Sequence, residues 1–337
     1  MSDLIDPTKL RDRIRGSLLG GAIGDALGSA FEFVDSASIE RAIGSNVVRD
    51  YHAALSGSLL APRRPGIPTD DTAMTLALIE ALVAGHPPAP QAILDTLSRR
   101  LRRGDGPIAS MFWEGGPGGA CIAMLRHAQA GRGPFEQLDP NAGGNGAAMR
   151  AHPCGAFADR AFVADVSATQ ARLSHPHPAA VAAAQTVALV VHAAIYDGRL
   201  SPAIPPEIDD PTMCHAWTSA HAGVRRTSAL PSRLLDVDMA GWNTVAAAHA
   251  IAYTYRDEPA VGIGLAAASG RDTDTIASIT GAMLGALHGA RILPDRWIEG
   301  LEGRDLVERA AADLFRTVVA IGARISPQCS SVDKPSP

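Results

Sequence analysis

The sequence has few cysteines, few aromatic residues and no strong excess of charge of either sign. Its 337 residues include 4 cysteines and 4% aromatic residues, and the formal net charge is −5. Charge this mixed gives no indication of a nucleic-acid surface. The cysteines, Cys121, Cys154, Cys214 and Cys329, form no C-x-x-C pair. A zinc site or a disulfide framework is therefore disfavoured, and free thiols in a reducing cytosol are expected.

Two further features are missing, an apolar leader and any residue run that alternates with the period of a strand. Residues 1–7 are acidic and lack an apolar core, so we expect a cytoplasmic protein without a secretion signal. The segment 179–196 is apolar for almost a membrane-spanning length, but it is rich in alanine and contains Gln185 and His192. A buried central helix is the favoured interpretation, so no membrane contact is expected.

Helical periodicity fills most of the chain instead. It predicts an all-α fold, a single compact multi-helix domain over residues 8–325, which we expect to be a monomer. Residues 326–337 contain serines and prolines and are expected to form a disordered tail. The clearest helical patterns, bounded by proline or glycine, cover residues 9–27, 72–84, 179–196, 243–255 and 305–321.

The first predicted helix carries glycines at every fourth position. Glycine costs roughly 1 kcal/mol inside a helix, so such a ridge predicts close approach of a second helix backbone. Packing explains these glycines but not Asp25, which lies within the ridge, or Glu32, which follows it between two phenylalanines. Glu32 is either an ordinary surface residue or a carboxylate tuned by apolar neighbours for acid–base work.

Acidic pairs occur at two helix entrances. Thr69, Asp70 and Asp71 precede one apolar helical pattern, and Asp272 and Asp274 precede another. Helix capping accounts for one acidic residue at each entrance. Four carboxylates brought together would repel one another unless a cation lay between them, and oxygen ligands of this kind suit Mg²⁺ or Mn²⁺. Sequence spacing alone does not show whether the two entrances meet.

Two glycine-rich loops and a histidine pair complete the candidate features. The loops are residues 113–119 and 141–146, and the second runs into 147–150. A glycine-rich loop that opens a helix presents free N–H groups, which suits phosphate, although neither loop matches a known phosphate-binding spacing. His175 and His177 precede Pro178 at a helix start, where a histidine is more often a cap than a ligand.

Taken together, these blocks resemble the ADP-ribosylglycohydrolase family, and among its branches the bacterial dinitrogenase reductase-activating glycohydrolases. The resemblance implies an all-α fold, a single compact multi-helix orthogonal bundle of the family's type. It also implies two divalent cations, Mg²⁺ or Mn²⁺, and cleavage of the glycosidic bond between ADP-ribose and an acceptor. The acceptor would be a protein side chain or a small ADP-ribosyl adduct. The blocks that carry the resemblance occur in family order and are Gly24-Asp25-Ala26-Leu27-Gly28, Glu32, Thr69-Asp70-Asp71-Thr72, Gly144 to Arg150, His175-Pro176-His177 and Asp272-Thr273-Asp274-Thr275.

The resemblance also implies roles for single residues. Glu32 matches a flap glutamate, and with Asp71 it is our candidate for the catalytic base. His175 matches a substrate-side histidine, and we add Asp25, Gly115 and Arg271 to the substrate-binding candidates. The metal ligands implied are Thr69, Asp70, Asp71, Asp272, Asp274 and Thr275, and the loop residues expected to line the ADP-ribose groove are Gly144, Asn145, Gly146 and Met149.

The chain departs from the family pattern at two places. Where the family usually has Gly-Gly, this sequence has Gly270-Arg271, and the guanidinium would contact a phosphate or pair with Asp272 or Asp274. Arginine-specific bacterial members carry an acidic residue in the loop that here reads 115–118, where the nearest acid is Glu114. Two alternatives stay open: a catalytically silent ADP-ribose-binding or structural protein, and a metal-dependent phosphohydrolase that releases AMP from a nucleotide diphosphate.

Overall fold

A computed structural model describes residues 5–136, 138–223 and 238–325 of the chain. Its regular structure is helical, and in these residues the only sheet-like contact is an isolated bridge between Gly144 and Ala240. The all-α prediction is confirmed, while the expected tail 326–337 lies outside the described residues. The helices are α1 Pro7–Gly28, α2 Ser36–Ile43, α3 Asp70–Ala84, α4 Pro90–Arg100, α5 Pro107–Glu114, α6 Gly119–Gln129, α7 Arg160–Arg172, α8 Pro178–Tyr196, α9 Pro211–Gly223, α10 Gly241–Thr254, α11 Pro259–Ala267, α12 Thr273–His288, α13 Asp295–Gly300 and α14 Arg304–Ile325, with short 3-10 helices at Ser29–Phe31, His152–Ala156 and Ala290–Ile292.

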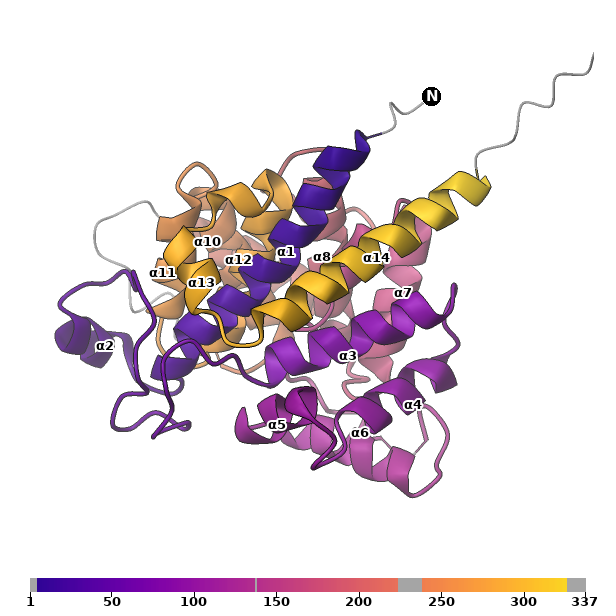
Figure 1. Ribbon diagram of the computed structural model, residues 1–337, viewed down its shortest axis with the longest axis horizontal. Helices are drawn as coiled ribbons and strands as arrows, with labels where there is room; N and C mark the ends of the chain where they lie inside the picture. The colour runs from indigo at the N-terminus through magenta and orange to yellow at the C-terminus, as the bar shows by residue number, and fades with distance from the viewer. Residues whose placement is uncertain (1–4, 137, 224–237, 326–337) are drawn as a thin grey trace, which may run out of the picture.

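Close packing of α1 on α12 organises the bundle, and α14 lies alongside α1 (Figure 1). A Cβ atom placed at Gly16, Gly20 or Gly24 would come within 2.3, 2.2 and 2.1 Å of carbonyl oxygens of α12. At the end of the ridge, a Cβ on Gly28 would lie 2.3 Å from the carbonyl oxygen of Thr273. A side chain at any of these positions would collide with α12. The prediction that a second helix backbone packs closely against the glycine ridge is therefore confirmed. The last turn of α1 is thereby held beside the first turn of α12.

The apolar helix α8 belongs to the core. By length and composition it is the one helix in the described residues that could cross a membrane, but 83% of its apolar window is buried inside the protein. Its polar residue His192 is also accommodated, because the ring Nδ1 lies 2.9 Å from the carbonyl oxygen of Phe157. His177 caps the helix through a hydrogen bond from the N–H of Ala179 at 3.2 Å, and Pro178 occupies the first turn. The interpretation as a buried central helix is confirmed.

The helices next to the two glycine-rich loops begin and end at other residues than the sequence predicted. Helix α5 continues through Trp113 and Glu114, and α6 begins at Gly119, so the first loop is shorter than predicted. The second loop leads into turns and a 3-10 helix rather than an α-helix. Pro153 lies in the first turn of this 3-10 helix, where its missing N–H costs no intrahelical hydrogen bond.

Candidate active site

The end of α1 holds both acidic helix entrances in place. The buried Asp25 carboxylate accepts hydrogen bonds from the N–H of Thr69, at 2.9 and 3.0 Å, and from the N–H and hydroxyl of Thr72, at 3.0 and 2.6 Å. Asp25 therefore satisfies free N–H groups at the start of α3. On the α12 side, the Thr273 hydroxyl donates to the carbonyl oxygen of Gly28 at 2.9 Å. Asp25 is fully buried and positions the start of α3, and its predicted contact with substrate stays a prediction.

The two entrances meet directly. The Thr275 hydroxyl lies 3.3 Å from Asp71 Oδ1, across 204 residues of sequence. Thr69 caps α3 through a 3.3 Å hydrogen bond from the Asp71 N–H, as helix capping predicts. Asp272 occupies the corresponding position of α12, but its side chain makes no capping bond and accepts from Asn145 Nδ2 at 2.5 Å instead. Capping therefore leaves the Asp272 carboxylate unexplained.

Glu32 reaches the same place from the loop after α1. Its neighbour Phe31 is fully buried and anchors the loop, whereas Phe33 is 43% exposed. The Phe33 N–H donates to the carbonyl oxygen of Arg271 at 2.6 Å, and the Arg271 N–H donates to that of Val34 at 3.2 Å. Phe33 and Arg271 both have left-handed backbones, with φ of 62° and 64°. The residue beside Asp272 is thus bonded to the loop that carries Glu32.

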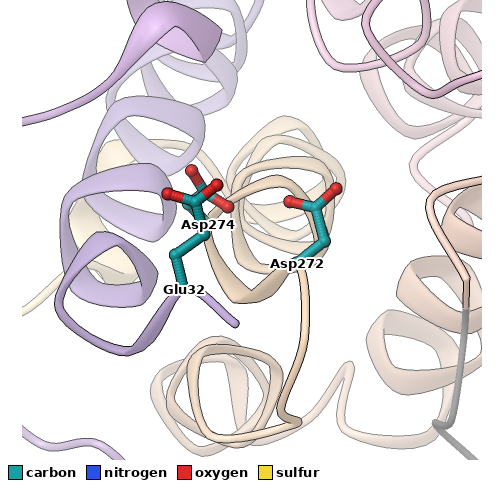
Figure 2. Close-up of side chains that lie close together, drawn as sticks. All are labelled: Glu32, Asp272 and Asp274. Carbon is teal, nitrogen blue, oxygen red and sulfur yellow. The ribbon is translucent and has the colours of Figure 1, made fainter. Parts of the chain in front are cut away.

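Three carboxylates from these two segments face one another. Glu32, Asp272 and Asp274 offer oxygen atoms that all lie within 4.8 Å of one another, and all three residues are buried (Figure 2). Burial, followed by the charges of Asp272 and Asp70, raises the pKa of Glu32 from 4.5 to about 9. Burial is also the largest cause that raises the pKa values of Asp70, Asp71 and Asp274 well above normal, with neighbouring carboxylates adding to it. Without a cation, the cluster therefore favours retaining protons.

A cavity of about 440 Å³ opens over these carboxylates. It brings together most of the side chains and loop residues predicted from the sequence, together with others that were not predicted. The predicted residues in its wall are Glu32, Asp70, Asp71, Gly144, Asn145, Gly146, Met149, His175, Asp272, Asp274 and Thr275. The candidates that do not line it are Asp25, Thr69, Gly115 and Arg271.

Gly115 and Arg271 lie next to the site residues but outside the cavity wall. A Cβ on Gly115 would lie 2.4 Å from the backbone nitrogen of Asp70, so this glycine lets the loop pass close to the start of α3. Arg271 is exposed, and its backbone holds the Glu32 loop. The positive φ explains why glycine suits this position in the family. Neither residue lines the cavity, and their direct contact with substrate stays a prediction.

Several residues of the site went unrecognised in the sequence. The mouth of the cavity includes Phe33, Leu59 and Met239, which are 43%, 58% and 45% exposed. Scattered exposed apolar residues have no distinctive sequence pattern, so nothing marked them as neighbours. Cys121 also lines the cavity. Arg150 is fully buried, and a single arginine within an apolar stretch was a signal available in the sequence.

The loop before α6 carries no acidic group toward the cavity. Gly116, Gly118 and Gly119 line the wall there, and the nearest acid, Glu114, accepts a hydrogen bond from the Ser110 hydroxyl at 2.8 Å. Glu114 itself does not line the cavity. This loop therefore contributes glycines and no carboxylate to the cavity wall.

The residues present fit a hard divalent cation. Glu32 Oε2 and Asp71 Oδ2 are buried and have no hydrogen-bond partner among the described residues. Buried carboxylate oxygens without partners are costly, and a cation that accepts them as ligands removes that cost. The surrounding ligand atoms are oxygens of carboxylates and threonine, which suit Mg²⁺ or Mn²⁺ better than zinc.

Comparison with known proteins agrees with this geometry. The sequence model of the ADP-ribosylglycohydrolase family matches residues 6–322. An ADP-ribosylarginine hydrolase Tri1 of Pseudomonas putida (strain GB-1) is 26% identical over 92% of this chain and 80% of its own length. The ADP-ribosyl-[dinitrogen reductase] glycohydrolase of Rhodospirillum rubrum is 27% identical over 87% of this chain and 91% of its own length.

The fold has a solved relative as well. A chain of an ADP-ribosylglycohydrolase-related protein complex superimposes with a TM-score of 0.70 and 24% sequence identity, covering 92% of this chain and 99% of that one. The family match extends over nearly the whole chain and includes every segment that lines the carboxylate cavity. The chain therefore belongs to the ADP-ribosylglycohydrolase family, whose enzymes cleave glycosidic bonds of ADP-ribose.

Proposed function

We propose that this protein is a hydrolase that needs two divalent cations, Mg²⁺ or Mn²⁺, and releases ADP-ribose from an ADP-ribosylated protein or small adduct. The observation that carries the proposal is the convergence of buried carboxylates, two of them with unpartnered oxygens, on the floor of a cavity. The residues proposed to hold the cations are Thr69, Asp70, Asp71, Asp272, Asp274 and Thr275. When bound, the cations would supply positive charge that fixes ribose hydroxyls and acidifies water.

Glu32 and Asp71 are the candidates for accepting a proton from the attacking water. Both are buried, both line the cavity, and each has an oxygen atom left without a partner. Glycoside cleavage passes through an oxocarbenium-like state, which nearby negative charge stabilises. Gly144, Gly146 and His175 line the same cavity and are the candidates for contact with the nucleotide portion.

Asn145 links the two sides of the cavity. Its side-chain Nδ2 donates to Asp272 and also lies 3.2 Å from the Thr244 hydroxyl of α10. Asn145 therefore orients a proposed metal ligand, as groups behind metal sites commonly do. The acceptor linkage is left to experiment, because the loop before α6 carries no carboxylate that would select a guanidinium. Free thiols at Cys121, Cys154 and Cys214 agree with a proposed location in the reducing cytosol.

Identification of the reaction product tests this proposal. The protein would be incubated with an ADP-ribosylated substrate and Mg²⁺ or Mn²⁺, and the nucleotide product would be separated by chromatography. Intact ADP-ribose is the expected product, and chelation of the cation should abolish its release. AMP would point to a phosphohydrolase, and tight binding without any product would point to a catalytically silent binder. Either of those results would overturn the proposal.

A further inference from the structure

Arg150 lies outside the proposed chemistry, yet it is fully buried within 4 Å of the cavity wall. Its guanidinium donates to Gln170 Oε1 at 2.7 Å, to the carbonyl oxygens of Gly146 and Gln170 at 2.6 and 2.9 Å, and to the Ser174 hydroxyl at 2.8 Å. Within the described residues its partners are neutral groups rather than carboxylates, although burial lowers its pKa. A buried arginine held entirely by neutral acceptors is uncommon and calls for a role.

The hydrogen bond from Arg150 to Ser174 determines which atom accepts the hydroxyl proton of Ser174. Ser174 is buried, and its oxygen lies 2.8 Å from Arg150 and 2.8 Å from the ring Nδ1 of His175. Arginine has no acceptor atom, so it can only donate to the serine oxygen. The serine proton is therefore free for Nδ1, which is the one remaining partner of this hydroxyl in the described part of the chain. If Nδ1 donated instead, the buried serine proton would be left without an acceptor.

From this geometry we propose that Arg150 and Ser174 are positioning residues that fix His175 as the neutral tautomer with its proton on Nε2. The neutral form agrees with burial and the neighbouring guanidinium, which lower the pKa of His175 to about 3. The Nε2 atom has no hydrogen-bond partner among the described residues. It lies 3.5 and 3.2 Å from the Cβ positions of Gly144 and Gly146, two glycines of the cavity wall.

The consequence is a fixed hydrogen-bond donor in the wall of the cavity. Nε2–H faces a space whose expected occupant carries phosphate and ribose oxygens, all of which accept hydrogen bonds. A histidine held as the other tautomer would present a lone pair to the same oxygens and repel them. This part of the inference rests on the proposed function, whereas the tautomer itself follows from the contacts of the protein alone.

Nitrogen NMR of the ring provides a test that does not depend on activity. The full-length protein would be labelled with ¹⁵N-histidine, and His175 assigned as the signal pair lost in His175→Gln. We expect a protonated Nε2 and an unprotonated Nδ1, unchanged from about pH 6 to pH 8 because the pKa lies far below. A protonated Nδ1, or titration of His175 in that range, would overturn the proposal.

Ser174→Ala tests the relay itself. Arg150 keeps its other three hydrogen bonds in this variant, so the fold should survive, and Ser167→Ala is the matched control. Ser167 is also fully buried, and its hydroxyl donates to the carbonyl oxygen of Val163 at 2.7 Å, far from His175 in the hydrogen-bond network. Ser174→Ala should change the tautomer signals of His175, whereas Ser167→Ala should not. Unchanged signals in Ser174→Ala would overturn the relay.

Binding of ADP-ribose, measured by calorimetry, tests the donor role. Loss of one well-oriented hydrogen bond should weaken binding by Ser174→Ala about 10-fold, with the affinity of Ser167→Ala unchanged. Changed tautomer signals with unchanged affinity would overturn the donor role. If the wild-type protein binds no ADP-ribose, the proposed function fails, and the donor role with it, while the NMR result still decides the tautomer.

Discussion

Single carboxylates that look equivalent in the sequence have different contacts in the structure. Asp25 accepts four hydrogen bonds at the start of α3, whereas Glu32 and Asp71 each retain an unpartnered oxygen in the cavity. The difference lies in the direction of each side chain, which the sequence pattern does not specify. A buried acid with all its oxygens satisfied is a structural element, and one with an orphaned oxygen is a candidate for chemistry.

Glu32→Gln separates a catalytic base from a metal ligand. The amide keeps the shape of the side chain and removes its capacity to accept the proton of the attacking water. We expect turnover to fall by roughly 10²-fold or more, with cation and ADP-ribose binding largely retained, measured by steady-state kinetics and calorimetry. Parallel losses of binding and turnover would identify Glu32 as a ligand, and full turnover would transfer the role of base to Asp71.

Asp71→Asn and Asp274→Asn address the proposed cation site. Each replaces a buried carboxylate with an amide of the same shape at a helix entrance, so helicity measured by circular dichroism should remain nearly unchanged. Cation affinity should fall by at least about 10-fold and activity should fall with it, because changes behind a metal site already cost that much. Full cation binding by either variant would show that the residue in question serves as a helix-terminal residue only.

The raised pKa of Glu32 gives a prediction about pH. Because its pKa rises from 4.5 to about 9, the folded protein holds a proton that the unfolded chain releases across this interval. This contribution to the free energy of unfolding is complete at low pH and is lost as pH rises toward 9. The buried histidines act in the opposite direction, but below their normal pKa of about 6.5. The buried thiols of Cys121 and Cys154, whose pKa values rise from 9.0 to about 12, act in the same direction as Glu32 as the pH approaches 9, so comparison with Glu32→Gln isolates the carboxylate.

Thermal unfolding with and without cation measures this effect. In chelator, the melting temperature should fall between about pH 7 and pH 9, and the fall should be smaller in Glu32→Gln. Mg²⁺ or Mn²⁺ should raise the melting temperature by more at the higher pH, because binding no longer has to displace protons. A cation effect that is independent of pH would contradict the raised carboxylate pKa values.

At the scale of elements, the α1–α12 contact decides where the site forms. Steps of four residues along α1 match steps of four along α12, and the contact continues to Gly28 and Thr273 at the acidic entrance. The glycine ridge is therefore a distance constraint that brings Glu32 close to Asp274. Its sequence signal was readable because a helix rarely tolerates four glycines without a packing reason.

Gly20→Ala tests this contact away from the cavity. Its Cβ would lie 2.2 Å from the carbonyl oxygen of Gly281, so α1 and α12 must separate. We expect a loss of roughly 1–3 kcal/mol in the free energy of unfolding, measured by denaturant titration. Gly322→Ala in α14 is the matched control, because a Cβ there meets nothing within 4 Å, and it should stabilise the protein by up to roughly 1 kcal/mol. Equal effects of the two substitutions would contradict the close contact.

In the molecule as a whole, the helices were predicted from the sequence more accurately than the contacts between them. Apolar periodicity placed α1, α3, α8, α10 and α14 within a few residues of their observed bounds. Asp71 and Thr275 are 204 residues apart in the sequence, and their contact depends on tertiary packing that a local sequence pattern does not specify. Family resemblance supplied that pairing in advance. The resemblance did not indicate that Asp25 and Gly115 are absent from the cavity wall. Membership of a motif does not show which of its residues line the cavity.

The apolar mouth of the cavity was likewise not predictable. Phe33, Leu59 and Met239 come from three distant segments and are exposed, so they contribute nothing to the periodicity of any buried face. Arg271 illustrates a different case, because its backbone contacts with the loop that carries Glu32 could not be read from its charge. Its left-handed φ of 64° would suit glycine better, and its backbone is bonded to Phe33 and Val34 of the Glu32 loop.

We propose that buried carboxylates at two helix entrances form a cation-dependent site for cleavage of ADP-ribosyl bonds. The most direct measurement is product analysis with ADP-ribosyl-arginine, ADP-ribosyl-serine and O-acetyl-ADP-ribose, each assayed in Mg²⁺, Mn²⁺ and chelator. The account predicts that intact ADP-ribose is released from one or more of these substrates, that chelator abolishes release, and that added cation restores it. Release that persists in chelator, release of AMP, or no product from any of the three substrates would contradict it.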